Sequence, residues 1–129
     1  MPTVQRVIPL LVYEDIESAH DFLVEVFGFG AGGVERDGEG EVVHGEVTGG
    51  DTVMWLHRVS PEHEMASPGT MDAQSGGLVV RVDDVDAHYE RARAAGARID
   101  REPTDQPYGQ REYGVRDLEG HRWWFATPL

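Results

Sequence analysis

One spacing recurs along this chain and restricts its fold more than any single motif does. An aspartate, a glycine and a tryptophan of the first half each reappear 69 positions later: Asp15 with Asp84, Gly45 with Gly114, and Trp55 with Trp124. Each half has the pattern of one strand, one amphipathic helix and three further strands. The sequence therefore predicts a βαβββ unit that occurs twice, which implies gene duplication and a pseudo-twofold architecture.

The repeat predicts the element boundaries. Alternating, β-branched and aromatic stretches predict strands at 5–13, 31–36, 41–48 and 52–58, then at 77–83, 97–102, 110–116 and 121–126. Each helix has an aspartate suited to its N-cap, Asp15 or Asp84, and ends at a glycine, Gly28 or Gly96. "RDGEGE" (36–41) and "PTDQPYG" (103–109) have the composition of turns.

These boundaries predict one α+β domain over residues 1–129, built from a first module (1–58), a linker (59–76) and a second module (77–129). The linker contains two prolines and many small polar residues. It is interpreted either as an ordinary mobile connection or as a lid over a ligand pocket.

The charge and the cysteine content exclude several classes of protein. With 24 acidic against 11 basic side chains, the formal net charge is -13, which disfavours binding to nucleic acids and to anionic membranes. The chain has no cysteine, so disulfides, thiol nucleophiles and cysteine-ligated metals are excluded. The apolar stretch near the N-terminus is too short for a membrane span, and we expect a cytoplasmic protein.

Two stretches resemble a known family. "PYGQREYGVRDLEGHRWWF" (107–125) is similar to the closing motif of the vicinal oxygen chelate superfamily, and "LLVYEDIESAHDFLVEVFGFG" (10–30) to its first strand and helix. That superfamily includes glyoxalase I, extradiol dioxygenases, bleomycin-resistance proteins and PhnB-like proteins. The resemblance implies two tandem βαβββ modules that form an incomplete barrel around a cavity, and it implies a homodimer.

The resemblance also implies where a metal would lie, and this chain departs from the pattern there. The four positions that carry metal ligands in enzymes of the family are Ile8, Trp55, Gly77 and Trp124 here. None of these side chains offers a carboxylate or an imidazole, so we expect no metal at that site and no cofactor. The only alternative ligands on strands are His44 and His57, together with Glu46.

Period-two alternation predicts which side chains face the cavity, if the four vacant ligand positions face inward. On that basis Trp124 faces the cavity, whereas its neighbours Trp123 and Phe125 belong to the core. His44 and Tyr113 are 69 positions apart and are expected to face the cavity from neighbouring strands. The predicted ligand-binding residues are Ile8, His44, Trp55, His57, Arg81, Tyr113, Arg122 and Trp124.

Three functions are compatible with this set. In the favoured hypothesis Trp55 and Trp124 form aromatic walls for a small molecule, an aromatic or amphipathic metabolite or antibiotic, which is sequestered without reaction. In the alternative, the protein is a lyase, isomerase or dioxygenase-type enzyme that uses His44 or His57 as base or as noncanonical metal ligands. In a third, the two indoles touch and plug a collapsed cavity, and the protein binds a partner chain.

Overall fold

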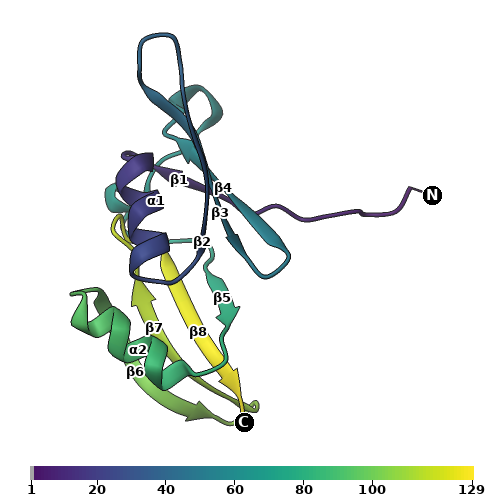
Figure 1. Ribbon diagram of the computed structural model, residues 1–129, viewed down its shortest axis with the longest axis vertical. Helices are drawn as coiled ribbons and strands as arrows, with labels where there is room; N and C mark the ends of the chain where they lie inside the picture. The colour runs from purple at the N-terminus through teal and green to yellow at the C-terminus, as the bar shows by residue number, and fades with distance from the viewer. Residues whose placement is uncertain (1) are drawn as a thin grey trace.

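The computed structural model describes residues 2–129 and contains the two expected βαβββ modules (Figure 1). The first consists of β1 (Leu10–Tyr13), α1 (Ile16–Glu25), β2 (Gly30–Arg36), β3 (Val42–Gly49) and β4 (Thr52–Arg58). The second consists of β5 (Leu78–Arg81), α2 (Val85–Ala94), β6 (Arg98–Gln106), β7 (Gln110–Arg116) and β8 (Arg122–Pro128). Between them lie two short 3₁₀ turns, η1 (Pro61–His63) and η2 (Pro68–Thr70).

Two predicted boundaries are wrong. The first strand begins at Leu10 rather than at residue 5: the N-terminal segment projects from the body of the protein (Figure 1), and only its end approaches β4, where the carbonyl of Pro9 accepts the backbone N–H of Trp55 at 2.9 Å. The sixth strand continues to Gln106, so that the first half of the "PTDQPYG" stretch is strand and only its second half turns the chain.

Each module forms its own four-stranded sheet. The strand orders are β1-β4-β3-β2 and β5-β8-β7-β6, with the first strand of each module parallel to the last. Leu10 lies beside Trp55 in the first sheet and Val79 beside Trp124 in the second. Both residues of the second pair stand 69 positions after those of the first, which confirms the repeat at the level of register.

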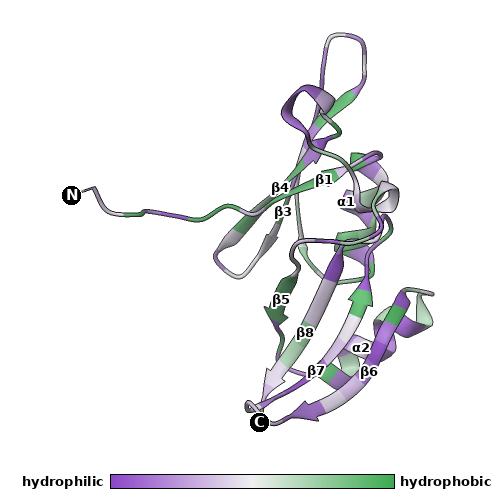
Figure 2. Ribbon diagram, turned by 180° about the vertical axis from the view of Figure 1, so that it is seen from behind, coloured by the Kyte–Doolittle hydropathy of each residue, from purple (hydrophilic) through white to green (hydrophobic). Residues whose placement is uncertain are grey.

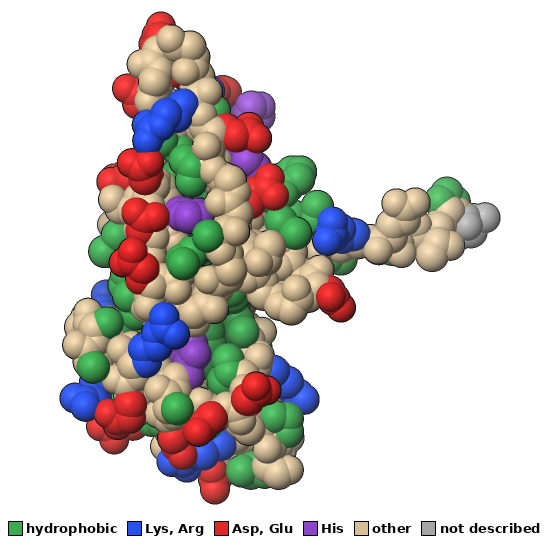
Figure 3. Space-filling view, in the orientation of Figure 1, with side chains coloured by type: hydrophobic (Ala, Val, Ile, Leu, Met, Phe, Trp, Pro, Cys, Tyr) green, Lys and Arg blue, Asp and Glu red, His purple; other side chains and the backbone are tan. Residues whose placement is uncertain are grey.

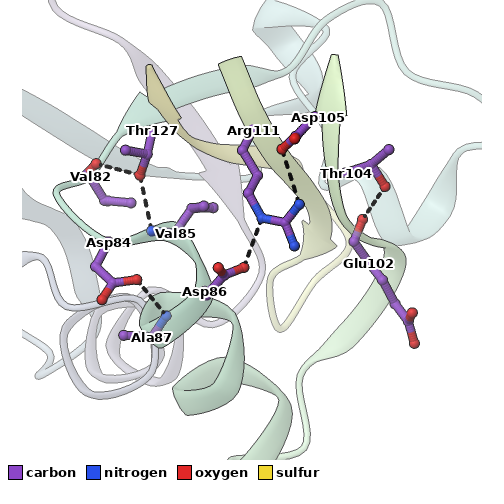
Figure 4. A network of polar contacts seen from close by, with 10 residues as sticks. All are labelled: Val82, Asp84, Val85, Asp86, Ala87, Glu102, Thr104, Asp105, Arg111 and Thr127. Atoms are coloured by element: carbon purple, nitrogen blue, oxygen red, sulfur yellow. Dashed lines mark hydrogen bonds and ion pairs between the residues drawn. The ribbon is translucent and has the colours of Figure 1, made fainter. Parts of the chain in front are cut away.

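The two helices begin for the same local reason. The Asp15 carboxylate accepts the backbone N–H of Ser18 at 3.0 Å, and Asp84 accepts that of Ala87 at the same distance. The start of α2 is further held to β8 by Thr127, whose hydroxyl accepts the N–H of Val85 at 3.0 Å (Figure 4). No helix within residues 2–129 is long and apolar enough to cross a membrane.

The hydrophobic core joins the two modules. Phe27 and Phe29, which follow α1, pack edge-on or tilted against Trp123 and Phe125 of β8, with ring centroids 5.0–6.3 Å apart. Trp123 and Phe125 are fully buried, as the alternation predicts. Since helices cover the core side, each sheet keeps an opposite face that no helix covers, here called the uncovered face (Figures 1 and 2).

Charge is spread over the outside of this fold. In the view of Figure 3, acidic side chains lie along both modules, while the hydrophobic side chains between them are only partly exposed. On this face of the molecule the acidic side chains are therefore spread over both modules rather than gathered at one site (Figure 3).

Candidate functional site

The uncovered face of the first sheet carries three of the predicted residues. His44 pairs directly with His57 across β3 and β4, and Glu46 pairs with Trp55, so all four side chains project from the same face. The His44 ring meets the Trp55 indole edge-on, with centroids 5.5 Å apart, and its Nε2 lies 2.9 Å from a Glu46 carboxylate oxygen. Trp55 itself remains 38% exposed, which is unusual for an indole. This face is thus an open aromatic surface with a histidine–glutamate pair beside it.

The uncovered face of the second sheet carries Trp124, and two glycines determine how it lies. A Cβ atom on Gly77 would stand 2.4 Å from Cζ3 of the indole, and one on Gly114 would stand 3.5 Å from its Nε1. The indole therefore lies across the sheet, with its benzene edge over Gly77 and its pyrrole edge over Gly114. The guanidinium carbon of Arg122 stands 5.4 Å from the centroid of the same ring, a cation–π contact.

The two tryptophans belong to different sheets, and no aromatic contact joins them within residues 2–129. The alternative in which the two indoles touch each other is therefore wrong within the described residues. Leu10 and Val79, which flank them in register, are 37% and 61% exposed. Both uncovered faces thus expose an aliphatic side chain beside their tryptophan.

Tyr113 does not face the cavity, contrary to the prediction. It pairs with Phe125, is fully buried on the helix side and lies 2.6 Å from Nδ1 of His88 through its hydroxyl. Burial raises its pKa. The reason is a difference of one residue in register: Tyr113 would have to oppose Ala126 to match the pairing of His44 with His57. The spacing of 69 therefore fails to predict the orientation of β7.

The remaining predicted residues lie apart. Ile8 is half-buried and precedes β1. Arg81 is exposed at the end of β5, beside Ala126, whereas Arg122 is at the opposite end of β8. The structure thus groups the residues in two sets, His44, Trp55 and His57 on the first sheet and Arg122 and Trp124 on the second.

Sequence reasoning missed the role of Asp117, which stands in the "DLEGH" turn before β8. One of its carboxylate oxygens accepts the backbone N–H groups of residues 119–121 at 3.0–3.1 Å. The other accepts the Tyr13 hydroxyl at 2.5 Å and the Trp123 indole N–H at 3.1 Å. Burial and the charge of Asp117 raise the pKa of Tyr13 well above its usual value. Because Tyr13 is the last residue of β1, its hydrogen bond to Asp117 connects the first module to the second.

Glu119 of the same turn also connects the second module to the first, and to the linker. Its carboxylate accepts the N–H groups of Glu14 and Asp15 at 2.7 and 2.9 Å, just before α1, and the hydroxyl of Ser67 in the linker at 2.7 Å. The turn, the first helix and the linker therefore hold one another in place. Asp117 and Glu119 were visible in the sequence, but their partners Tyr13, Glu14 and Asp15, about a hundred positions away, were not.

The comparison with known proteins decides the family. The sequence profile of the Glyoxalase/Bleomycin resistance protein/Dioxygenase superfamily matches residues 4–125. The chain belongs to this superfamily. An uncharacterized protein of Mycobacterium bovis is 32% identical over 125 residues, which cover 94% of this chain and 82% of that protein.

Two solved structures resemble the chain over almost their whole length. TioX from Micromonospora sp. ML1 is 35% identical, with a TM-score of 0.74 and coverage of 98% of this chain and 100% of TioX. TnmS3 from Streptomyces sp. CB03234, described as an antibiotic binding protein, is 28% identical, with a TM-score of 0.76 and full coverage of both chains.

The metal site that the superfamily implies does not fit this chain. The four ligand positions hold Ile8, Trp55, Gly77 and Trp124, and the last of these covers Gly77 with its own ring. An indole nitrogen carries a proton and offers no lone pair to a cation. Within residues 2–129, no group of three or more histidine, cysteine or acidic side chains is arranged to hold a metal ion. Among the described residues, His44 and Glu46 are therefore not joined by a third side chain that could complete a metal site.

Proposed function

We propose that the protein is a metal-free binding protein that sequesters an aromatic or amphipathic small molecule, such as a metabolite or an antibiotic. The observation that carries the proposal is the position of Trp124. Its indole lies over Gly77 and Gly114, and Gly77 and Trp124 are the two second-module positions that the resemblance assigns to metal ligands. A flat apolar surface thus stands where the resemblance would place a cation.

Three further observations support this function. Trp55 provides a second exposed aromatic surface, and His44 and His57 add hydrogen-bonding groups beside it. TnmS3 shares the fold over the whole chain and is described as antibiotic binding. No bond-breaking step is needed, because burial of an apolar ligand is itself the stabilising event.

We also propose that two copies associate to enclose the ligand. The uncovered faces leave Leu10, Trp55 and Val79 exposed, and the projecting N-terminal segment leaves Val4 and Val7 80% and 77% exposed. Apolar exposure of this extent on a small domain favours an interface. Sedimentation velocity should therefore detect a dimer, and Val79→Asp should shift it towards the monomer.

Tryptophan fluorescence tests the binding function directly. Titration with a panel of aromatic antibiotics and metabolites should quench the emission and give saturable curves. Trp124→Phe should weaken the affinity for the best ligand by about fivefold, since an aromatic contact in a desolvated site contributes about 1 kcal/mol beyond its area. Unchanged affinities in both Trp55→Phe and Trp124→Phe would contradict the proposal.

One observation favours a second function. The 2.9 Å contact between His44 and Glu46 orients the imidazole in the manner of a general base with its carboxylate partner. An isomerase or lyase reaction would then use His44 on a ligand bound against Trp55. Turnover of any ligand from the panel, abolished by His44→Gln with binding retained, would establish the enzyme.

A further inference from the structure

A row of three arginines crosses the second sheet. Arg98 of β6 lies directly opposite Arg116 of β7, and Arg116 lies directly opposite Arg122 of β8. Residues directly opposite one another project from the same face. Arg122 stands two residues before Trp124 and contacts its ring, so the row belongs to the uncovered face and adjoins the indole.

This arrangement is unfavourable unless an anion compensates for it. Like charges directly opposite one another destabilise a sheet, and this chain has only 11 basic side chains to place. One carboxylate, Asp100, serves the row: it accepts from Nε of Arg116 at 3.0 Å and lies 3.7 Å from Nε of Arg122. Nε of Arg122 is buried, and among the described residues it has no hydrogen-bond partner.

Another arginine of β7, Arg111, shows a fully neutralised guanidinium group for comparison. Arg111 donates to Asp86 of α2 and to Asp105 of β6, at 3.0 Å each (Figure 4). Arg111 thus has two carboxylates to itself, whereas Arg116 and Arg122 share Asp100, and no ion pair within residues 2–129 involves Arg98. Among the described residues, the row therefore has more guanidinium donors than acceptors.

The three arginine side chains line a cavity. Arg98, Arg116 and Arg122 line a space of about 660 Å³ that is closed on one side by the linker, from Pro68 to Gln74, and on another by the turn before β8. Gln74 holds the linker to this turn by donating to the carbonyl oxygen of Gly120 at 2.6 Å. The space suffices for a small organic molecule.

Acidic groups also line the cavity, but two of the three are already engaged. Asp117 accepts from Tyr13, Trp123 and the turn, and Glu119 accepts from the start of α1 and from Ser67. Asp72 is exposed on the linker, and no ion pair joins it to the row within residues 2–129. Of the charged side chains that line the cavity, the arginines of the row are therefore the ones that can bind a charged ligand group.

We propose that Arg98, Arg116 and Arg122 form an anion-binding subsite, and that the ligand of this protein carries a carboxylate, sulfonate or phosphate group beside an aromatic part. The planar guanidinium groups present parallel N–H donors that match such oxyanions. The oxyanion lies on the arginine row, and the aromatic part lies on Trp124. The second half of this assignment rests on the proposed binding function.

A matched pair of dyes tests the subsite. Anilinonaphthalene sulfonate and the neutral phenylnaphthylamine share one aromatic skeleton and differ in the anionic group. Both should bind with a rise in dye fluorescence. Arg122→Gln and Arg98→Gln should each weaken the sulfonate by about tenfold, as expected for loss of a charge-assisted hydrogen bond, and leave the neutral dye unchanged. Inorganic sulfate, compared with chloride at equal ionic strength, should displace the sulfonate alone.

The control is Arg93→Gln, which removes the same charge from the outer side of α2, where Arg93 pairs with Glu90 at 2.8 Å. It should bind both dyes as the unmodified protein does. If both dyes bind but neither row variant affects the sulfonate more than this control does, the anion subsite is refuted and the binding function stands. If neither dye binds the unmodified protein, the binding function itself fails.

Discussion

Substitution of Asp117 by asparagine tests whether one carboxylate holds the two modules together. The carboxylate is 6% exposed and accepts five hydrogen bonds, three from backbone N–H groups and one each from Tyr13 and Trp123. An amide oxygen can replace the acceptor for the three backbone groups. The amide nitrogen then faces the indole N–H of Trp123, and two donors oppose each other.

The expected cost follows from these contacts. The indole N–H loses a charged acceptor and is left buried without a partner, which costs about 1–3 kcal/mol. The hydrogen bond with Tyr13 survives with the direction reversed but loses its charge, at a further cost of about 1 kcal/mol. We therefore expect Asp117→Asn to lower the free energy of unfolding by about 3 kcal/mol, a large share of the roughly 5–15 kcal/mol of a typical domain.

Urea unfolding followed by tryptophan fluorescence measures this change, and Asp37→Asn is the matched control. Asp37 also accepts two backbone N–H groups of its own turn, at 2.9 and 3.0 Å, but it is exposed between β2 and β3. Its substitution should cost less than about 1 kcal/mol. Equal costs for the two variants would refute the role of Asp117.

Two further predictions concern the second module. Gly77→Ala should displace the Trp124 indole and lower the free energy of unfolding by about 1–3 kcal/mol. Gly76 has open space around it, so the control variant Gly76→Ala should unfold as the unmodified protein does. Equal urea midpoints for the two variants would contradict the packing of Trp124 against Gly77. Burial lowers the pKa of His88, and the charge of Arg91 lowers it further, although the hydrogen bond to a backbone carbonyl raises it. Below about pH 6.5 the unfolded chain therefore binds a proton that the folded chain does not. Stability should therefore fall as the pH drops from about 7 to about 5.5, by at most about 1.4 kcal/mol per unit from this group, and His88→Gln should show a flatter dependence; parallel curves would refute the assignment.

The sequence predicts the modules, the helix caps and the faces within single strands well, because these depend on neighbouring residues. Trp123 and Trp124 divide between core and uncovered face as alternation requires. The sequence predicts the register between neighbouring strands less well, because the register depends on the length of the turn that joins them. Gly49 opposes Thr52 across a tight turn, whereas Arg116 opposes Arg122 across a longer one. No local pattern shows that this difference shifts the register by one residue.

The candidate site was predictable only in part for the same reason. The aromatic residues could be found from the spacing of 69, but the arginine row arises from pairing across three strands. Arg98 and Arg116 carry no local signal that distinguishes them from other surface arginines. Asp117 lies in a recognised motif, but its partners come from β1 and β8.

The shifted register of β7 sets a rule for engineering this protein. Residues on β1 and β4 can be transplanted to β5 and β8 at a distance of 69 positions, since their pairing coincides. The same transfer from β3 to β7 turns an outward side chain inward, as His44 and Tyr113 illustrate. A designer who wants a symmetric binding surface must therefore first shift the pairing of β7 with β8 by one residue, so that Tyr113 opposes Ala126.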